Sequence, residues 1–499
     1  MTFACGALLL GCLASGVKAQ QLNVTVHVFP GSAGHVVIEG NCEPTKVWSF
    51  RNEYAGISDL GARVDGLKLF DPAGAEVPAR KIAPGQFEAA TAAGKFRYEV
   101  NLAPPARASD AARVSWLNKE QGLLMLADLL PVSQSKAANS RESVKVLFKL
   151  PAFCAVYSNE KESAQGGFEV ADADRAVFVV GTHLRSSRTN VSGMTFGLVT
   201  DGDWAFADGE ALKLGADVLK MDREVFGAMP SKQGTLILLP FPQPAAVSMW
   251  SAETRGSTVT LLMGKLPSKT AALSQLSVPL THELFHLWVP NALALTGDYD
   301  WFYEGFTVYQ AARTAVRLGL LTFQEFLNGI ARAYDAYAVA ADRDRWSLVE
   351  ASKRRWTAGA PSVYSKSMVV AFLYDLKLRS QSRGKRSLDD VYRKMFQDYH
   401  SSDAGSNRVA AGQGTDGNDA AAIALAGDSG IQGFVQGFIR EPVTISLASE
   451  LAQFGLRVET FGLRTRLSAG EQLSKPQRDL LRELGYNDSA RSSTQKKHS

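Results

Sequence analysis

The hydrophobic and polar positions divide the chain into three stretches that differ in period. Up to about residue 160, short segments alternate between apolar and polar residues, and Gly, Pro and Asp separate them, which predicts strands. From about 166 to 270 strand and helix patterns mix, and beyond residue 281 the apolar residues recur at helical spacing. The clearest segments are strands at 24–29, 96–102, 176–180, 234–239 and 257–263, and helices at 302–318, 322–341 and 365–379.

These patterns predict a multidomain α+β protein in which a β-sandwich-like domain precedes a catalytic domain with a mixed α/β part and a helical part. Surface loops are expected at 401–418 and 424–430, which are rich in Gly, Ser, Asp and Asn, and disorder is expected beyond Ser489. The expected divisions are a signal peptide at 1–19, a β-rich domain at 20–165, an α/β catalytic subdomain at 166–310, a helical catalytic subdomain at 311–460 and a C-terminal tail at 461–499.

Composition and charge narrow the class of protein. Hydrophobic residues make up 45% of the 499 residues and charged residues 21%, which is an ordinary globular balance. Lys plus Arg number 54 against 50 for Asp plus Glu, and the net charge of +4 is spread without a long basic run. Binding to nucleic acid or to an anionic membrane is therefore not expected, and no stretch of the mature chain predicts a membrane span.

The amino terminus resembles an export signal. An apolar run over 8–13 leads to small residues that end at Ala19, so we expect cleavage there and an exported, periplasmic or secreted, protein; a short buried helix is the alternative. Cys12 follows Leu-Leu-Gly, which resembles a lipoprotein cleavage site and keeps a lipid anchor open. After cleavage Cys42 and Cys154 remain, either as a disulfide or as two separate thiols.

The candidate chemistry begins with His-Glu-Leu-Phe-His, whose ends are His282 and His286, on a helix expected to run from near Pro279 to Pro290. Positions i and i+4 lie on one face of a helix, so both imidazoles can bind one metal ion. Glu283 lies beside that face and is the candidate base that accepts a proton from the attacking water.

A third ligand is expected from the next helix. Glu304 follows His286 by 18 positions, within Trp-Phe-Tyr-Glu-Gly-Phe, and completes a His, His, Glu set that leaves one coordination position open. An accidental pair of histidines on a surface helix is the alternative, but the chain has only seven histidines. The spacing therefore predicts one Zn²⁺ per chain.

The two motifs together resemble the M61 glycyl aminopeptidase family and, more broadly, the gluzincins, which include thermolysin and the M1 aminopeptidases. The residues that carry the resemblance are His-Glu-x-x-His-x-Trp and Trp-x-x-Glu-Gly-Phe-Thr-x-Tyr, followed by 364–367, 373–379 and 384–390. The resemblance covers roughly residues 235 to 460. It implies a thermolysin-like zincin domain, peptide substrates and release of N-terminal residues such as Gly or Ala.

The same resemblance implies roles for two further residues. Tyr364 would donate a hydrogen bond to the oxyanion that forms during hydrolysis, unless it is a core tyrosine. Glu253, on a strand edge at 252–258 that resembles the family's peptide-binding edge, would bind the substrate ammonium, unless it is a solvated surface residue.

Departures from the family pattern limit these implications. The linker from His286 to Glu304 is short and contains Val289-Pro290, so the rim of the cleft and the preference for Gly or Ala are expected to differ. Only about forty residues follow Glu459, so the family's PDZ domain is expected to be absent. Three functions stay open: a zinc aminopeptidase, a zinc endopeptidase of the same fold, and an inactive homologue that binds peptides. The oligomeric state is not predicted.

Overall fold

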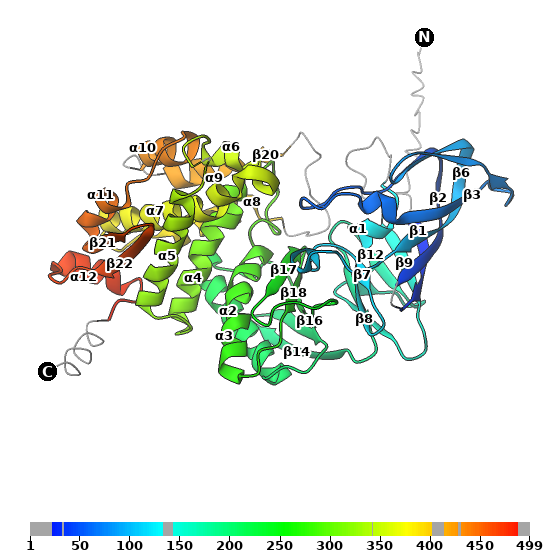
Figure 1. Cartoon of the computed structure of the whole chain (residues 1–499), viewed down its shortest axis with the longest axis horizontal. Coiled ribbons are helices and arrows are strands. Elements are labelled where there is room, and N and C mark those ends of the chain that lie inside the picture. The colour runs from blue at the N-terminus through cyan, green and yellow to red at the C-terminus, as the bar shows by residue number, and fades with distance from the viewer. Residues whose placement is uncertain are drawn as a thin grey trace, which may run out of the picture.

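The fold is arranged as three parts along the length of the molecule, with a sheet-rich end, a central sheet and a helical end (Figure 1). This computed structural model describes residues 22–31, 34–132, 143–341, 343–401, 414–427 and 431–487. The expected signal peptide, the segment beyond Ser489 and residues 402–413 and 428–430 of the two expected loops lie outside these residues. Cys42 and Cys154 do not form a disulfide with each other, so the alternative of a Cys42–Cys154 pair is excluded.

The N-terminal part is built from two sheets that share a core. The larger has the order β11 (Lys161–Glu162), β12 (Phe168–Val170), β9 (Val144–Lys149), β1 (Leu22–Phe29), β2 (His35–Ser49), β6 (Gln86–Asn101), β3 (Val64–Phe70) and β4 (Glu76–Val77), with β5 (Ala79–Ala83) on β6. The smaller has the order β10 (Ala155–Ser158), β13 (Val177–Gly181), β8 (Gln121–Met125) and β7 (Trp116–Leu117).

Every second residue of β1 is buried, and this face packs against apolar side chains from β8 and β13. The predicted β-sandwich-like fold is thereby confirmed. Because β13 pairs with β8 and β10, the sheet-rich part extends to Gly181, past the boundary expected at residue 165.

The central part is a five-stranded sheet, in the order β14 (Arg185–Val191), β15 (Met194–Thr200), β16 (Gln233–Pro240), β18 (Thr258–Met263) and β17 (Trp250–Arg255). Its three inner strands are parallel, and both outer strands are antiparallel to their neighbours. One face packs on the helices α2 (Asp208–Phe226) and α3 (Lys269–Glu283), and the other on the smaller N-terminal sheet. This leaves β17 as an edge strand, as the sequence predicted.

The helical part confirms the predicted helices and contains further helices and a β-hairpin that were not predicted. It contains α4 (Thr307–Arg317), α5 (Phe323–Ala338), α6 (Leu348–Ser352), α7 (Ser367–Ser382), α8 (Leu388–Tyr399), α9 (Gly417–Ala426), α10 (Gln432–Val435), α11 (Leu447–Leu451), α12 (Lys475–Arg482) and the hairpin of β21 (Leu456–Phe461) and β22 (Arg464–Ala469). Among the helices within the described ranges, none combines the length and the apolar composition needed for a bilayer span.

The helices and strands differ from the expected segments at three places. Helix α3 begins at Lys269 and not near Pro279, because the Ser268 hydroxyl accepts a hydrogen bond from the Ala271 amide and caps an earlier turn. β20 (Thr415–Asp416) and α9 begin inside the expected loop at 401–418, where Asp416 caps α9. The expected tail at 461–499 contains β22 and α12.

A buried ion network joins the helices that follow the predicted site residues. Asp375 on α7 accepts hydrogen bonds from Tyr309 Oη on α4 at 2.6 Å, Arg379 Nε at 2.9 Å and the Leu388 amide of α8 at 2.7 Å. Arg313 Nε of α4 lies 3.8 Å from the same carboxylate. Burial acts to raise the pKa of Asp375, but the two guanidinium groups outweigh it and hold the pKa at about 2. The carboxylate is therefore a charged link between three helices.

Replacement of Asp375 by Ala should lower the free energy of unfolding by about 3 to 5 kcal/mol, because two buried arginines lose a shared counter-charge. Urea denaturation measures this change. The matched control is Asp398→Ala, whose partner Lys394 is exposed, so that its cost should stay below about 1 kcal/mol. Equal losses in the two variants would show that the network does not stabilise the helical part.

Candidate metal centre and substrate cleft

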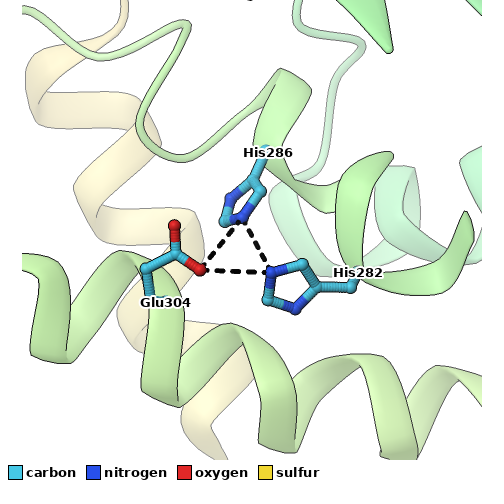
Figure 2. Close-up of side chains that lie close together, drawn as sticks. All are labelled: His282, His286 and Glu304. Atoms are coloured by element: carbon cyan, nitrogen blue, oxygen red, sulfur yellow. Dashed lines mark hydrogen bonds and ion pairs between the residues drawn. The ribbon is translucent and has the colours of Figure 1, made fainter. Parts of the chain in front are cut away.

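The first two candidate ligands lie at the end of α3. His282 Nε2 is 3.0 Å from His286 Nε2, so both rings point at the same place, as Figure 2 shows. His286 Nδ1 donates a hydrogen bond to the Val289 carbonyl at 2.8 Å. Since that carbonyl can only accept, the neutral ring carries its proton on Nδ1 and leaves Nε2 free as a ligand.

Glu304 completes the group from the wide π-helical turn Trp301–Phe306 that leads into α4. Its Oε2 is 3.2 Å from His282 Nε2 and 3.6 Å from His286 Nε2 (Figure 2). Gly305 makes this placement possible, because a Cβ there would lie 2.2 Å from Ser367 Cβ and 2.2 Å from the Val363 carbonyl oxygen. The glycine of the Trp-x-x-Glu-Gly motif thus brings Glu304 against the segment that contains Tyr364.

The donor set fits a zinc ion. One atom from each of the three side chains lies within 4.8 Å of the others, and two imidazole nitrogens with one carboxylate oxygen are a typical catalytic zinc set with an open position. Burial lowers the pKa of His286, but the Glu304 carboxylate outweighs it and raises that pKa to about 9. A positive charge therefore stabilises this buried group, whether it is a proton on His286 or a divalent cation.

Arg355 holds the opposite side of the Glu304 carboxylate. Its Nη2 is 2.8 Å from Glu304 Oε1, and its Nη1 is 2.8 Å from Asp300 Oδ1, which also accepts a 2.6 Å hydrogen bond from Tyr303 Oη. The guanidinium carbon lies 4.3 Å from the centre of the Trp356 ring. Burial acts to raise the pKa of Glu304, but Arg355 and the histidines hold it well below its usual value. Arg355 therefore fixes one oxygen and directs the other toward the histidines.

Glu283 lies beside the metal ligands and is oriented by the edge strand. Thr254 Oγ1 on β17 lies 2.7 Å from Glu283 Oε2, within hydrogen-bond distance, and 3.0 Å from the Glu283 carbonyl oxygen. Glu283 is 7% exposed. The carboxylate is therefore held in place while retaining a free oxygen.

Glu253 is enclosed by residues of the N-terminal part. Tyr54 Oη donates a 2.6 Å hydrogen bond to Glu253 Oε1, and Arg113 Nε lies 3.7 Å from Oε2. Burial raises the pKa of Glu253, although Arg255, Tyr54 and Arg113 oppose the shift. Its side chain is only 18% exposed, so Glu253 is not a solvated edge residue.

Tyr364 lies on the same side of the site as Glu304. It belongs to the π-helical turn Ser362–Lys366, and the Arg355 guanidinium lies 5.4 Å from the centre of its ring. Burial and the Glu304 carboxylate raise the pKa of Tyr364, so its hydroxyl stays protonated and can donate a hydrogen bond. The ring is partly exposed, which argues against a purely core role.

Several residues of the site escaped the sequence analysis. Asp300 and Tyr303 adjoin Glu304 and could have been suspected from that position alone. Arg355 and Arg113 carry no local motif, and Tyr54 precedes Glu253 by 199 positions. Only the tertiary fold brings these last three to the cleft.

The comparisons with known proteins agree with this geometry. Residues 276–372 match the family model described as M61 glycyl aminopeptidase, which confirms the resemblance over the stretch from His282 to Tyr364. No curated protein sequence matches significantly.

Solved structures share the fold at low sequence identity. An aminopeptidase N family protein from Idiomarina loihiensis is 17% identical with a TM-score of 0.73, covering 88% of this chain and 79% of that one. An M1 zinc metallopeptidase from Deinococcus radiodurans is 14% identical with a TM-score of 0.51, covering 86% and 96%. A mutant of that enzyme bound to a Tyr-Ser-Ala substrate is 13% identical with a TM-score of 0.53, over the same shares.

Replacement of Arg355 by Gln should weaken zinc binding by about 10- to 100-fold, because the carboxylate ligand loses its fixed orientation and its counter-charge. Competition with a chromophoric chelator measures the dissociation constant directly. The neighbouring Arg354→Gln is the matched control, since Arg354 pairs with Glu350 at 3.0 Å away from the ligands. A zinc affinity unchanged in Arg355→Gln would refute the positioning role.

Proposed function

We infer that this protein is a zinc-dependent peptidase that removes N-terminal residues. The chain matches the M61 glycyl aminopeptidase family over its candidate metal site and shares its fold with M1 zinc metallopeptidases. One observation carries the proposal: His282, His286 and Glu304 direct their ligand atoms at one point, with Glu283 beside them. All three ligands and the base are present, which argues against an inactive peptide-binding homologue. Peptide substrates are further supported by the Tyr-Ser-Ala complex of the Deinococcus enzyme.

His282, His286 and Glu304 would hold the zinc ion. When bound, zinc would make a coordinated water acidic and polarise the scissile carbonyl group. Arg355 keeps the Glu304 carboxylate charged and oriented for this purpose.

Glu283 would accept the proton of the attacking water and deliver it to the leaving amine. The contact with Thr254 orients its carboxylate. Tyr364 would donate a hydrogen bond from its hydroxyl group to the oxyanion of the tetrahedral intermediate. Because its pKa is raised, Tyr364 would keep its proton while it stabilises that negative charge.

Glu253 supports the choice of an aminopeptidase over an endopeptidase. Its buried carboxylate lies on the edge strand that also carries Thr254, the partner of the base. A substrate ammonium bound there would place the first peptide bond next to Glu283 and exclude longer amino-side segments. A zinc endopeptidase is the second candidate, and it applies if Glu253 does not meet the substrate.

Two variants should separate the base from the ligands. Glu283→Gln should retain one equivalent of zinc and lose at least about 100-fold in turnover of a peptide, because an amide cannot accept the proton. Glu304→Gln should lose zinc as well as activity. Elemental analysis and a peptide-digestion assay with and without chelator give both readouts, and chelator-resistant hydrolysis by the wild type would refute the proposal.

The wild type should cleave free peptides at least about 30-fold faster, in kcat/KM, than their acetylated forms, because only the free amine pairs with Glu253. Glu253→Gln should shrink this ratio by slowing the free peptide, with zinc retained. Glu224→Gln, which alters an exposed carboxylate on α2, is the matched control and should leave the ratio unchanged. Internal cleavage of acetylated peptides at full rate would favour the endopeptidase.

A further inference from the structure

Arg113 reaches from the N-terminal part into the cleft. It follows the short turn Ala108–Asp110, and its own carbonyl accepts a 2.7 Å hydrogen bond from Arg255 Nη2, so its backbone is tied to the central sheet. Its guanidinium carbon lies 5.2 Å from the centre of the Trp356 ring, in the helical part. The side chain is 27% exposed, so the charged group is fixed by stacking and remains accessible.

The Arg113 guanidinium is incompletely paired. Its Nε is buried and, within the described part of the chain, has no hydrogen-bond partner. The 3.7 Å separation from Glu253 Oε2 is an ion pair that is too long for a hydrogen bond, and Glu253 Oε1 already accepts from Tyr54. Among the described residues the two terminal nitrogens also form no hydrogen bond, and, unlike Nε, they are not buried, so they can donate to a second carboxylate.

The first residue of the substrate would lie against this guanidinium. In the proposed function its ammonium meets Glu253 and its carbonyl oxygen meets Tyr364. Arg113 pairs with Glu253 and stacks on Trp356. The Arg355 guanidinium lies 4.3 Å from the centre of the same Trp356 ring and 5.4 Å from the centre of the Tyr364 ring, so Arg113 lies on the Tyr364 side of the cleft as well. Only one Cα separates the amine from the carbonyl carbon of that residue. A side chain on that Cα would therefore lie within reach of the Arg113 guanidinium.

The charges favour an acidic side chain. Arg113 and Arg255 already offset the charges of the Glu253 and Glu283 carboxylates, so a substrate ammonium adds a further cation to this group. A carboxylate on the first substrate residue would restore the balance and accept hydrogen bonds from the planar guanidinium. An apolar first residue would leave the excess positive charge and the unbonded terminal nitrogens in place.

We propose that Arg113 makes the amino-side pocket selective for peptides that begin with Asp or Glu, an inference that rests on the proposed aminopeptidase function. Arg113 is thus a specificity-determining residue. The alternative, in which Arg113 only neutralises Glu253, makes a different prediction for the same variants.

The test compares peptides that differ only in the first residue, Glu against Gln and Asp against Asn. For at least one of the two pairs, the wild type should cleave the acidic peptide about 10- to 100-fold better than its amide counterpart, in kcat/KM. This is the range expected for a hydrogen bond between charged groups. Arg113→Gln should reduce this ratio to near one, and Arg113→Lys should restore part of it. Arg107→Gln removes the same charge from the same segment but at an exposed residue paired with Asp110, and should keep the wild-type ratio.

A wild-type ratio near one, in a protein that cleaves these peptides, would overturn the proposal and leave the aminopeptidase function intact. Equal acceleration of acidic and neutral peptides by Arg113→Gln would also overturn it, because Arg113 would then merely compete with the ammonium. If no peptide is cleaved, the proposed function fails. Calorimetric binding of the same pairs to zinc-loaded Glu283→Gln then decides separately whether Arg113 selects the acid.

Discussion

The buried charge of Glu304 is the constraint on which the site depends. A carboxylate removed from water is stable only if each oxygen meets a positive charge or a donor. Arg355 meets Oε1 at 2.8 Å, and the two imidazoles lie at Oε2, where a cation completes the balance. The two oxygens therefore have separate roles, one structural and one for the metal, and the second depends on the first.

This charge balance determines how the helical part must pack. Arg355, Glu304 and Tyr364 each belong to a wide π-helical turn, a geometry that is common at functional sites. Gly305 lets two of these turns touch, and the Asp375 network holds the helices that continue from them. The ligand geometry is thus supported by contacts well outside the metal site.

The sequence predicted what is local and missed what is not. The spacing of His282, Glu283 and His286 is a helical property, and Glu304 follows in a short motif on the next helix, so local patterns and ligand chemistry were enough to group them. The start of α3 was misplaced because Pro279 is a common first-turn residue, yet the Ser268 cap outweighed that signal. Arg355 and the partners of Glu253 come from distant segments, and one sequence contains no information that pairs them.

The two carboxylates of the cleft show how environment separates roles within one site. Glu283 lies within hydrogen-bond distance of the Thr254 hydroxyl and, among the described residues, forms no ion pair with an arginine or lysine, so its free oxygen can accept a proton. Glu253 accepts a hydrogen bond from Tyr54 and pairs with Arg113, so its carboxylate is fixed in position by these two residues. Both of these partners belong to the N-terminal part. The candidate metal ligands therefore all come from the catalytic part, whereas Glu253 on its edge strand is held by two residues of the β-rich part.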